Sequence, residues 1–310
     1  MAYLLSVDGG GTKTEFCISD LAETEKKSFL TGSTNFKSVG VKEARKNIKE
    51  GFQWVQEELG IRKEDIAFAV FGISGCDSEK DYDIIHEELV KGELPKERYL
   101  LCNDGVMGFY AQTDGAGIVL IAGTGSIAIG IDKNGKIYRS GGWGYNFSDA
   151  GSGYWIGCEA ARETLRYCDG CREYAALFEN IRKHFQAENF EKLPFAITGI
   201  QNNSEIAYLA KIVVDMAEAQ EPESVQILQE GARLLADLAG SVYKRARMQG
   251  ETKISIVLSG GVLKSACYEA FLKKELERKI PKEQTQYFGQ KNAPAYGGIK
   301  LAKRMLEKGV

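Results

Sequence analysis

Short apolar runs separated by polar and glycine-rich stretches dominate the first third of the chain, and they predict strands. The expected strands cover residues 4–8, 14–20, 25–30, 66–73 and 99–103. Between them the apolar positions change to a helical spacing, seen most clearly in Val41, Ala44, Ile48, Phe52, Val55 and Leu59. Helices are therefore expected over residues 41–59, 79–91 and 105–112. Three sequential strands followed by alternating helices and strands indicate a mixed sheet with helices packed on it, an α/β fold.

The same succession of apolar runs returns in the rest of the chain, which indicates a duplicated domain. Strands are expected over residues 117–122, 127–132, 136–140, 253–258 and 285–288. Two of them are joined through Asn134-Gly135, the pair preferred in type I′ hairpin turns. A long helical region is expected over residues 151–249, and a closing helix over residues 295–308.

The domain boundary is expected at Gln112–Gly115, between a predicted helix and a predicted strand. A length of 310 residues is enough for two domains and a sizeable core. The first domain is expected to comprise residues 1–113 and 290–310. The second is expected to comprise residues 114–289, including a helical insertion.

Each half opens with an apolar strand that ends in a turn rich in glycine and hydroxyl side chains. The two turns read Asp8-Gly9-Gly10-Gly11-Thr12-Lys13-Thr14 and Gly123-Thr124-Gly125-Ser126. Glycine lets the backbone approach a ligand closely, and successive N–H groups in such a turn form an anion-binding concavity. Asp8, at the strand end, can hold a cation directly or through water. The two turns therefore predict a site for a nucleoside triphosphate with Mg²⁺, held between the halves.

Two other phosphate-binding motifs do not fit these turns. A P-loop requires Gly-x4-Gly-Lys-Ser/Thr before a helix, whereas Gly135-Lys136 is followed by Ile137. A dinucleotide-binding fingerprint requires Gly-x-Gly-x-x-Gly between a strand and a helix, whereas the segment after Thr14 has the pattern of a strand. For either turn taken alone, a simple glycine-containing hairpin is the alternative.

The composition is that of a soluble globular enzyme, with 44% hydrophobic and 27% charged residues. A net charge of −3 argues against nucleic-acid and acidic-membrane partners. The sequence shows no secretory signal at its start and no uncharged apolar stretch of membrane-spanning length. The 7 cysteines are scattered and fit a reducing compartment better than a disulfide framework. We therefore expect a cytoplasmic protein without nucleic-acid or membrane partners.

The chain has only 2 histidines, His86 and His184, and both lie in charged segments that indicate exposed helix. A Ser-His-Asp hydrolase and a His-ligated zinc enzyme are therefore disfavoured, and a carboxylate is the expected catalytic base. Asn103-Asp104 follows an apolar strand and opens a helix, where open α/β sheets place reactive groups. The same pair also suits an Asx helix cap.

Two further segments suit ligand binding. Glycines alternate with aromatic residues and an Asp over residues 141–157, a pattern typical of a loop that wraps a small polar ligand. An aromatic-packed structural turn is the alternative. Ser259-Gly260-Gly261 joins a strand to a helix, and such backbone can lie against a nucleotide base or α-phosphate. Taken alone, this segment suits a simple helix entry equally well.

Together these motifs occur in an order and spacing that resembles the N-acetylglucosamine kinase and BadF/BadG/BcrA/BcrD ATPase family, within the actin, sugar kinase and Hsp70 superfamily. The resemblance spans nearly the whole chain and is carried by residues 8–14, 123–126, 142–144, 149–152 and 259–261. It implies a duplicated, two-domain ribonuclease H-like fold of the actin-like ATPase type, with a cleft between the domains. It also implies an ATP-dependent phosphotransferase that uses Mg²⁺ and phosphorylates the 6-hydroxyl of a hexosamine such as N-acetylglucosamine or glucosamine.

The resemblance assigns roles to individual residues. It implies that ATP is bound by Asp8, Gly10, Gly11, Thr12, Lys13, Thr14, Thr124, Gly125, Ser126, Gly260 and Gly261. Within that set Asp8 would hold the metal and Gly260-Gly261 would contact adenosine. The amino sugar would be bound by Asn35, Asn103, Asp104, Gly142, Trp143 and Asp149. Asp104 would also be the general base that accepts the proton of the sugar hydroxyl.

The match departs from the family at Ala150. The family usually has Gly-Asp-Glu-Gly-Ser in the aromatic loop, whereas this chain has Ser148-Asp149-Ala150-Gly151-Ser152. The second acidic residue is missing, which leaves the choice of hexosamine and its acetylation open. A homodimer is also left open by the sequence.

Two other functions fit the same fold. Some family members are ATPases that drive an electron into a dehydratase or reductase through a [4Fe–4S] cluster, and Cys168 and Cys171 suggest that function. A cluster needs four thiolates, which two copies of the chain can share, and a lone Cys-x-x-Cys is more often structural or incidental. An ATP-gated sugar sensor without catalysis is the third alternative, and the presence of Asp104 argues against it.

Overall fold

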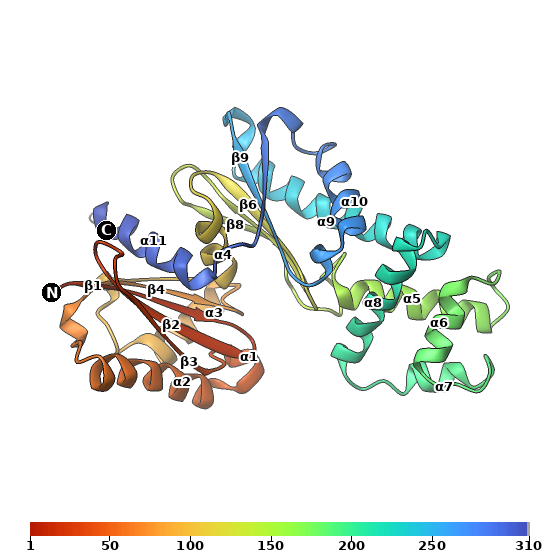
Figure 1. Cartoon of the computed structure of the whole chain (residues 1–310), viewed down its shortest axis with the longest axis horizontal. Coiled ribbons are helices and arrows are strands. Elements are labelled where there is room, and N and C mark those ends of the chain that lie inside the picture. Colours follow the sequence, from red (N-terminus) through yellow and green to blue (C-terminus); the bar gives the residue numbers. More distant parts are fainter. Residues whose placement is uncertain (309–310) are drawn as a thin grey trace. The chain divides into compact units, whose positions relative to one another are not determined.

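The computed structural model describes residues 1–308 and contains two compact units (Figure 1). The first unit comprises Met1–Asp114 with Gly289–Val310, and the second comprises Gly115–Phe288. The boundaries expected from the sequence, at residues 113 and 290, lie beside these bounds.

The first unit is built on a five-stranded mixed sheet. Its strands are β1 (Tyr3–Gly9), β2 (Lys13–Asp20), β3 (Lys26–Gly32), β4 (Ile66–Ile73) and β5 (Tyr99–Cys102). They lie in the order β3-β2-β1-β4-β5. The first three strands pair antiparallel, whereas β4 runs parallel to both β1 and β5. The carboxyl ends of β1, β4 and β5 therefore meet at one edge of the sheet.

Helices cover both faces of this sheet. They are α1 (Phe36–Val39), α2 (Val41–Gln53), α3 (Glu79–Ile84), α4 (Asp104–Gln112) and α11 (Pro294–Glu307), with π-helical segments at Trp54–Glu58 and Ile85–Val90. In Figure 1, α11 lies on one face of the sheet and α2 on the other. Apolar strand residues such as Val7, Phe16 and Phe71 are fully buried beneath the helices. The alternating helices and strands expected from the sequence thus form a sheet whose central strands are buried by helices on both faces.

The second unit repeats this topology. Its strands are β6 (Gly117–Ala122), β7 (Ser126–Ile131), β8 (Ile137–Gly141), β9 (Ile254–Ser259) and β10 (Thr285–Gly289), in the order β10-β9-β6-β7-β8. As in the first unit, the opening three strands form an antiparallel meander, and the strand after the crossover runs parallel to the first. The duplication expected from the sequence is present at the level of strand order.

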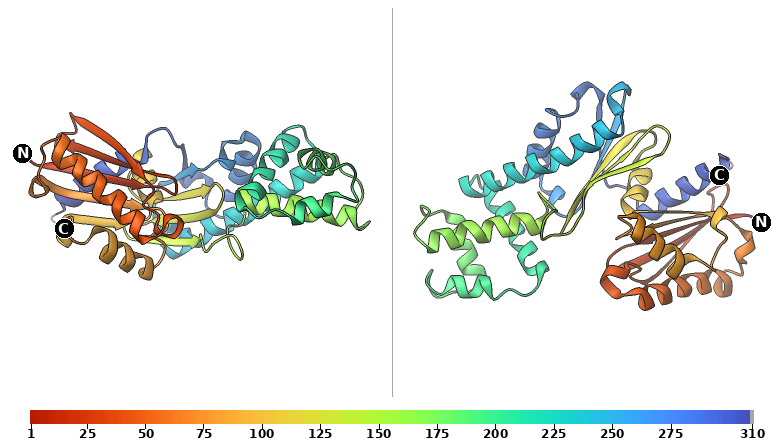
Figure 2. Two further views of the ribbon diagram at one scale, coloured as in Figure 1. Left: turned by 90° about the horizontal axis from the view of Figure 1, so that it is seen from below. Right: turned by 180° about the vertical axis from the view of Figure 1, so that it is seen from behind.

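The helical region expected over residues 151–249 is divided into five helices. They are α5 (Gly153–Cys168), α6 (Ala176–His184), α7 (Leu193–Thr198), α8 (Asn203–Glu218) and α9 (Pro222–Arg245). Gly170 ends the first of them in a left-handed conformation, with φ of 73°. Helix α9 packs on the sheet and α10 (Ala266–Leu276) packs on α9, whereas α5 to α8 form the insertion seen in Figure 2.

The two histidines differ in their surroundings. His184 is exposed, as expected, and stacks on Tyr208. The prediction of an exposed residue is wrong for His86, whose side chain is only 15% exposed. Its ring lies beside Tyr82 and shares a hydrogen bond with the Tyr99 hydroxyl, because the π-helical segment turns it toward β5.

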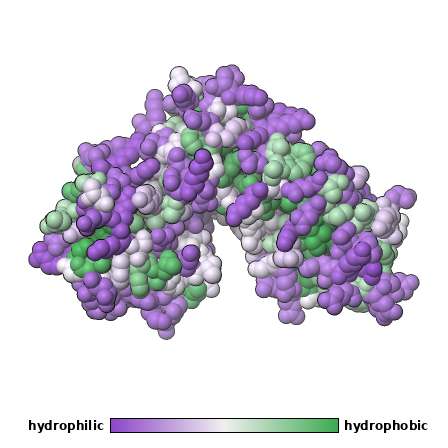
Figure 3. All heavy atoms as spheres, viewed as in Figure 1, coloured by the Kyte–Doolittle hydropathy of each residue, from purple (hydrophilic) through white to green (hydrophobic). Residues whose placement is uncertain are grey.

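Polar side chains cover most of the surface drawn in Figure 3. Among residues 1–308, no helix is both long enough and apolar enough to cross a membrane.

Candidate functional site

The β1–β2 turn of the first unit leaves its backbone open to a ligand. The Gly10 amide donates to the Lys13 carbonyl at 3.0 Å, which closes the turn, while Gly11, Thr12 and Lys13 are exposed. Thr14 is different, because it is fully buried and its hydroxyl donates to the Thr34 hydroxyl at 3.0 Å. The Thr14 side chain therefore ties the turn to the next loop, and only the exposed part of the turn is accessible to phosphate.

Two carboxylates lie near the edge where the parallel strands end. Asp8 is opposite Gly72 in the β1–β4 register, and Asp104 begins α4, separated from β5 by Asn103 alone. A Cβ atom at Gly72 would lie 3.3 Å from the Asp104 Cα and 2.1 Å from the Met107 Sδ. Because Gly72 lacks a Cβ atom, α4 can lie close to β4. Asp104, at the start of α4, therefore lies beside the end of the sheet.

Both carboxylates are harder to ionise than an ordinary Asp. Burial, and then the charge of Asp8, raises the pKa of Asp104 to about 7. Burial, and then the charge of Glu15, raises the pKa of Asp8 to about 6. A nearby cation or a proton would stabilise this pair, and perturbed carboxylates of this kind are typical of functional sites.

The pair fits a Mg²⁺ ion that arrives with a nucleotide. Mg²⁺ is commonly held by one or two carboxylates, with phosphate and water oxygens filling its other positions. Among residues 1–308, no group of three or more His, Cys, Asp or Glu side chains is arranged to hold a metal. Asp8, half-buried beside the exposed turn, can supply one carboxylate to an ion whose other ligands come from phosphate.

The sequence left open whether Asn103 and Asp104 act as a helix cap, and the structure shows that Asn103 does. Its side-chain oxygen accepts from the Gly105 amide at 2.9 Å, and its amide nitrogen donates to Asp77 at 2.9 Å. Asp104 is the first residue of α4 and also accepts from the Gly105 amide, at 3.0 Å. Both ends of the Asn103 amide are thus engaged by the protein.

Asn35 lies on the same unit, as the N-cap of α1. Its side-chain oxygen accepts from the Lys37 amide at 3.0 Å. Within the described residues its amide nitrogen has no hydrogen-bond partner, so it is available to a ligand hydroxyl. Nearby, the Lys37 ammonium binds Asp77 at 3.2 Å and Asp81 at 2.9 Å. Sequence reasoning missed Lys37, Asp77 and Asp81, although Asp77 follows the end of a predicted strand.

In the second unit, the β6–β7 turn borders a cavity of about 650 Å³. Its walls are Gly123, Thr124, Gly153, Ala207, Tyr208, Ala210, Lys211, Val214, Gly261, Val262, Lys264 and Ser265. Small and apolar side chains from α8 face backbone from two glycine turns, and two lysines supply positive charge. This combination is typical of a small-ligand pocket. Thr124 and Gly261 are the predicted ATP-binding residues that line it.

The remaining predicted ATP-binding residues of this unit, Gly125, Ser126 and Gly260, do not line the cavity. Ser126 is buried, and its hydroxyl donates to the Ala150 carbonyl at 2.8 Å. Gly260 has φ of 108°, and a Cβ atom there would lie 2.3 Å from the Ala122 carbonyl oxygen. Only glycine therefore fits at this position. The Ser126 hydroxyl, like that of Thr14, donates a hydrogen bond to another oxygen of the protein. Neither side chain is exposed to a ligand.

The aromatic loop has an exposed part and a buried part. Trp143 is 70% exposed, and the guanidinium of Arg139 lies 3.8 Å from the centre of its ring. Asp149 is only 7% exposed, and its Oδ2 atom lies 2.7 Å from the position that a Cβ atom at Gly125 would take. Trp143 is thus open to a ligand and the neighbouring Gly142 is partly exposed, whereas Asp149 lies against the β6–β7 turn.

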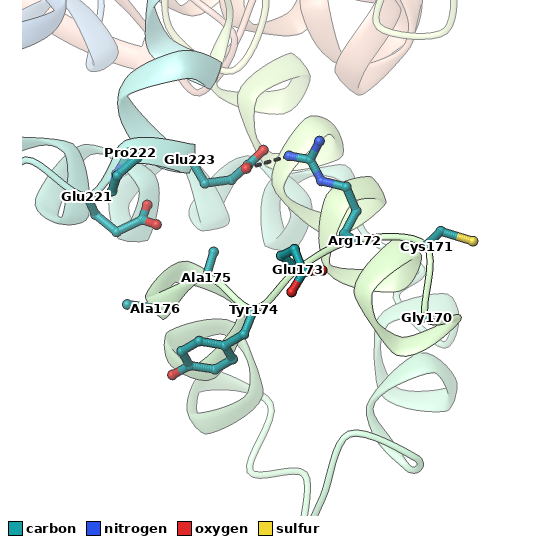
Figure 4. A pocket seen from close by; sticks show the side chains of 10 residues that line it. All are labelled: Gly170, Cys171, Arg172, Glu173, Tyr174, Ala175, Ala176, Glu221, Pro222 and Glu223. Atoms are coloured by element: carbon teal, nitrogen blue, oxygen red, sulfur yellow. Dashed lines mark hydrogen bonds and ion pairs between the residues drawn. The ribbon is translucent and has the colours of Figure 1, made fainter.

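Cys171 lines a separate cavity of about 650 Å³ in the helical insertion (Figure 4). The charged groups there are largely paired, since Arg172 binds Glu163 at 2.9 Å and also binds Glu223. None of the predicted site residues borders this cavity. Among residues 1–308, Cys168 and Cys171 belong to no group of three or more His, Cys, Asp or Glu side chains that could hold a metal ion.

Comparisons with known proteins agree with this organisation. A model of the BadF/BadG/BcrA/BcrD ATPase family matches residues 5–300. The chain is 30% identical over 308 residues to an N-acetylmuramic acid/N-acetylglucosamine kinase of Clostridium acetobutylicum, a match that covers 98% of this chain and 99% of that protein. It is 30% identical over 268 residues to an N-acetyl-D-glucosamine kinase of Dictyostelium discoideum, covering 83% and 84% of the two chains.

A solved structure supports the fold. The crystal structure of a candidate N-acetylglucosamine kinase from Chromobacterium violaceum superposes with a TM-score of 0.71, covering 97% of this chain and 99% of that chain at 21% identity. At this identity the likeness shows the fold alone. It confirms the α/β, two-domain fold of the sugar kinases and actin-like ATPases that the sequence predicted.

Proposed function

Because the chain belongs to the BadF/BadG/BcrA/BcrD ATPase family, we propose that it is an ATP-dependent kinase that phosphorylates the 6-hydroxyl of a hexosamine. The observation that carries this proposal is Asp104, whose pKa is raised to about 7 at the end of the parallel strands. A general base is most effective when its pKa lies near the working pH. The full-length similarity to kinases named for N-acetylmuramic acid and N-acetylglucosamine supports a hexosamine as the acceptor.

In the proposed reaction, Asp104 accepts the proton of the sugar 6-hydroxyl. The sugar oxygen forms a bond to the γ-phosphorus as the bond from that phosphorus to the β-phosphate oxygen breaks, and ADP leaves. Catalysis of phosphoryl transfer rests mainly on positioning and on stabilising the developing charge. Asp8 would hold Mg²⁺, which when bound neutralises charge on the phosphates. The amides of the exposed β1–β2 turn would donate to phosphate oxygens.

We propose that the 650 Å³ cavity of the second unit holds the nucleoside. Its volume falls in the range of small-ligand pockets, and α8 contributes apolar wall residues, including Ala210 and Val214. Thr124 and the amides of the β6–β7 turn would bind phosphate. Lys211 and Lys264, which also border the cavity, would favour an anionic ligand over a neutral one.

In the first unit, we propose that the sugar is contacted by the amide nitrogen of Asn35 and by Asp104. In the second unit, we propose that the exposed ring of Trp143 can bind a sugar. Aromatic rings offer an apolar surface to the face of a sugar ring. The Asn103 side chain is already hydrogen-bonded to Gly105 and Asp77. In this scheme Asn103 therefore contributes by capping α4, which begins with Asp104.

The test is ADP release measured against glucosamine, N-acetylglucosamine, N-acetylmuramic acid, glucose and no sugar. Stimulation by one or more amino sugars supports the proposal and identifies the acceptor. A 6-deoxy analogue of the best acceptor should give no stimulation, because it lacks the reacting hydroxyl. Slow ATP hydrolysis that is indifferent to every sugar would exclude the kinase, and binding of sugar without turnover would indicate a sensor.

A further inference from the structure

A single carboxylate links the two segments of the first unit that are assigned to the sugar. Asp77 lies in the loop after β4. One of its oxygens accepts from the Asn103 amide at 2.9 Å, and the other binds the Lys37 ammonium at 3.2 Å. Asn103 precedes Asp104 at the start of α4, and Lys37 lies in α1, two residues after its N-cap Asn35, which we propose contacts the sugar.

The loop that carries Asp77 also touches Asn35 directly. Gly75 has φ of 90°, and a Cβ atom there would lie 2.9 Å from the Asn35 side-chain oxygen. A larger residue at Gly75 would push Asn35 away from its position as the cap of α1. The loop thus contacts the Asn35 segment through its backbone and through the Lys37 ion pair.

The contacts of Asp77 lie in partly protected surroundings. The side chain of Asp77 is 19% exposed, compared with 42% for Lys37. Hydrogen bonds to an ionised group are shorter and stronger than neutral ones, and partial burial reduces their screening by water and salt. The carboxylate can therefore hold both segments in one geometry.

We propose that Asp77 is a positioning residue for hexosamine phosphorylation, which fixes Asp104 through Asn103 and fixes Asn35 through Lys37. The inference rests on the proposed kinase function and adds to it a residue that touches neither ATP nor the reacting atoms. A displacement of about 1 Å at a reacting group can lower the rate about 100-fold, so a residue of this kind has a measurable effect.

Asp81 provides a matched control. It binds the same Lys37 ammonium at 2.9 Å and is similarly protected, with its side chain 13% exposed. Its carboxylate also accepts from the Ser78 hydroxyl, at 2.7 Å, and from the backbone amide of Asp77, whereas the Asn103 amide donates to the Asp77 side chain. Asp81→Ala therefore removes one carboxylate from Lys37 and one acceptor from the Asp77 backbone, but it keeps the Asp77 side chain that binds Asn103.

The experiment compares steady-state kinetics of the wild type, Asp77→Ala, Asp77→Asn and Asp81→Ala with the best hexosamine. For Asp77→Ala we expect kcat/KM for the sugar to fall about 100-fold, while KM for ATP changes less than about twofold. Asp81→Ala should lose less than about fivefold, as expected for a partly exposed ion pair. Asp77→Asn keeps an oxygen for the Asn103 amide and should recover part of the loss.

Thermal unfolding of the same variants separates positioning from folding. If Asp77→Ala and Asp81→Ala lose activity equally while the wild type is sugar-dependent, the positioning role is wrong and the kinase assignment stands. Equal changes in KM for ATP and for sugar would also overturn it, because a general loss of structure acts on both. If the wild type releases no ADP in response to any hexosamine, the kinase assignment fails and this inference fails with it.

Discussion

Replacement of Asp104 by Asn should abolish most activity and at the same time stabilise the ligand-free protein. Asn has nearly the same shape, and its oxygen can still accept from the Gly105 amide that Asp104 binds at 3.0 Å. The substitution removes only the proton acceptor and the charge. Since a positioned general base contributes about 10²–10⁴-fold, kcat should fall by that factor, with ATP affinity nearly unchanged.

The stability effect follows from the raised pKa. The pKa of Asp104 rises from the usual 3.8 to about 7 in the folded protein, through burial and then the charge of Asp8. A carboxyl with a raised folded-state pKa lowers stability progressively as the pH rises from about 4 to about 7. At about 1.4 kcal/mol for each pH unit between the two pKa values, ionisation costs up to about 4 kcal/mol. The effective dielectric constant of real protein interiors lowers such costs, and we expect roughly 2 kcal/mol.

The assay is thermal unfolding without ligands at pH 8 and pH 5. About 2 kcal/mol corresponds to a rise in Tm of roughly 5 °C for Asp104→Asn at pH 8, and the rise should shrink toward pH 5. Asp81→Asn is the control, because hydrogen bonds from Lys37 and Ser78 outweigh burial and lower the pKa of Asp81, so its ionisation stabilises the fold. That variant should show no rise at pH 8. An unchanged Tm for Asp104→Asn, or a rise independent of pH, would refute the electrostatic reasoning. Retained turnover would remove Asp104 from the chemistry.

Three other expectations concern the second unit and the metal. Gly260→Ala should lower the stability by about 3 kcal/mol, seen as a lower Tm, because a Cβ atom would lie 2.3 Å from the Ala122 carbonyl oxygen at φ of 108°. Val214→Trp should fill part of the 650 Å³ cavity and raise KM for ATP at least about tenfold, with KM for sugar unchanged; equal changes in both would place the nucleoside elsewhere. Removal of Mg²⁺ with EDTA should abolish turnover but leave the Tm of the ligand-free protein unchanged, since no group of three or more metal-binding side chains is found within residues 1–308. A lower Tm in EDTA would instead reveal a resident ion.

The strands and the glycine turns could be predicted because their signals are local. Apolar runs such as 66–73 form strands with those bounds, and the turns after Asp8 and Ala122 appear where glycine and hydroxyl residues interrupt them. The repeated order of runs was sufficient to predict the duplicated topology. A continuous helical region over 151–249 was harder to divide, because its breaks depend on single residues such as Gly170.

The partners of individual side chains could not be predicted, because they come from distant parts of the chain. Thr14 and Ser126 match a phosphate-binding pattern, yet both are buried and hydrogen-bonded to protein oxygens. His86 is drawn into the interior by Tyr99, a contact that only the packing of a π-helical segment creates. Asp77 has no motif of its own and becomes visible as a candidate only when β4, α1 and α4 are brought together.

The measurement that tests the central claim most directly is the stoichiometry of products from wild-type protein, ATP, Mg²⁺ and the best hexosamine. ADP and phosphorylated sugar are quantified in the same sample, and phosphorus-to-proton NMR correlation identifies the carbon that carries the phosphate. The account predicts one hexosamine 6-phosphate for every ADP, with both products lost together in Asp104→Asn. ADP formed without sugar phosphate, or phosphate on another hydroxyl, would contradict it.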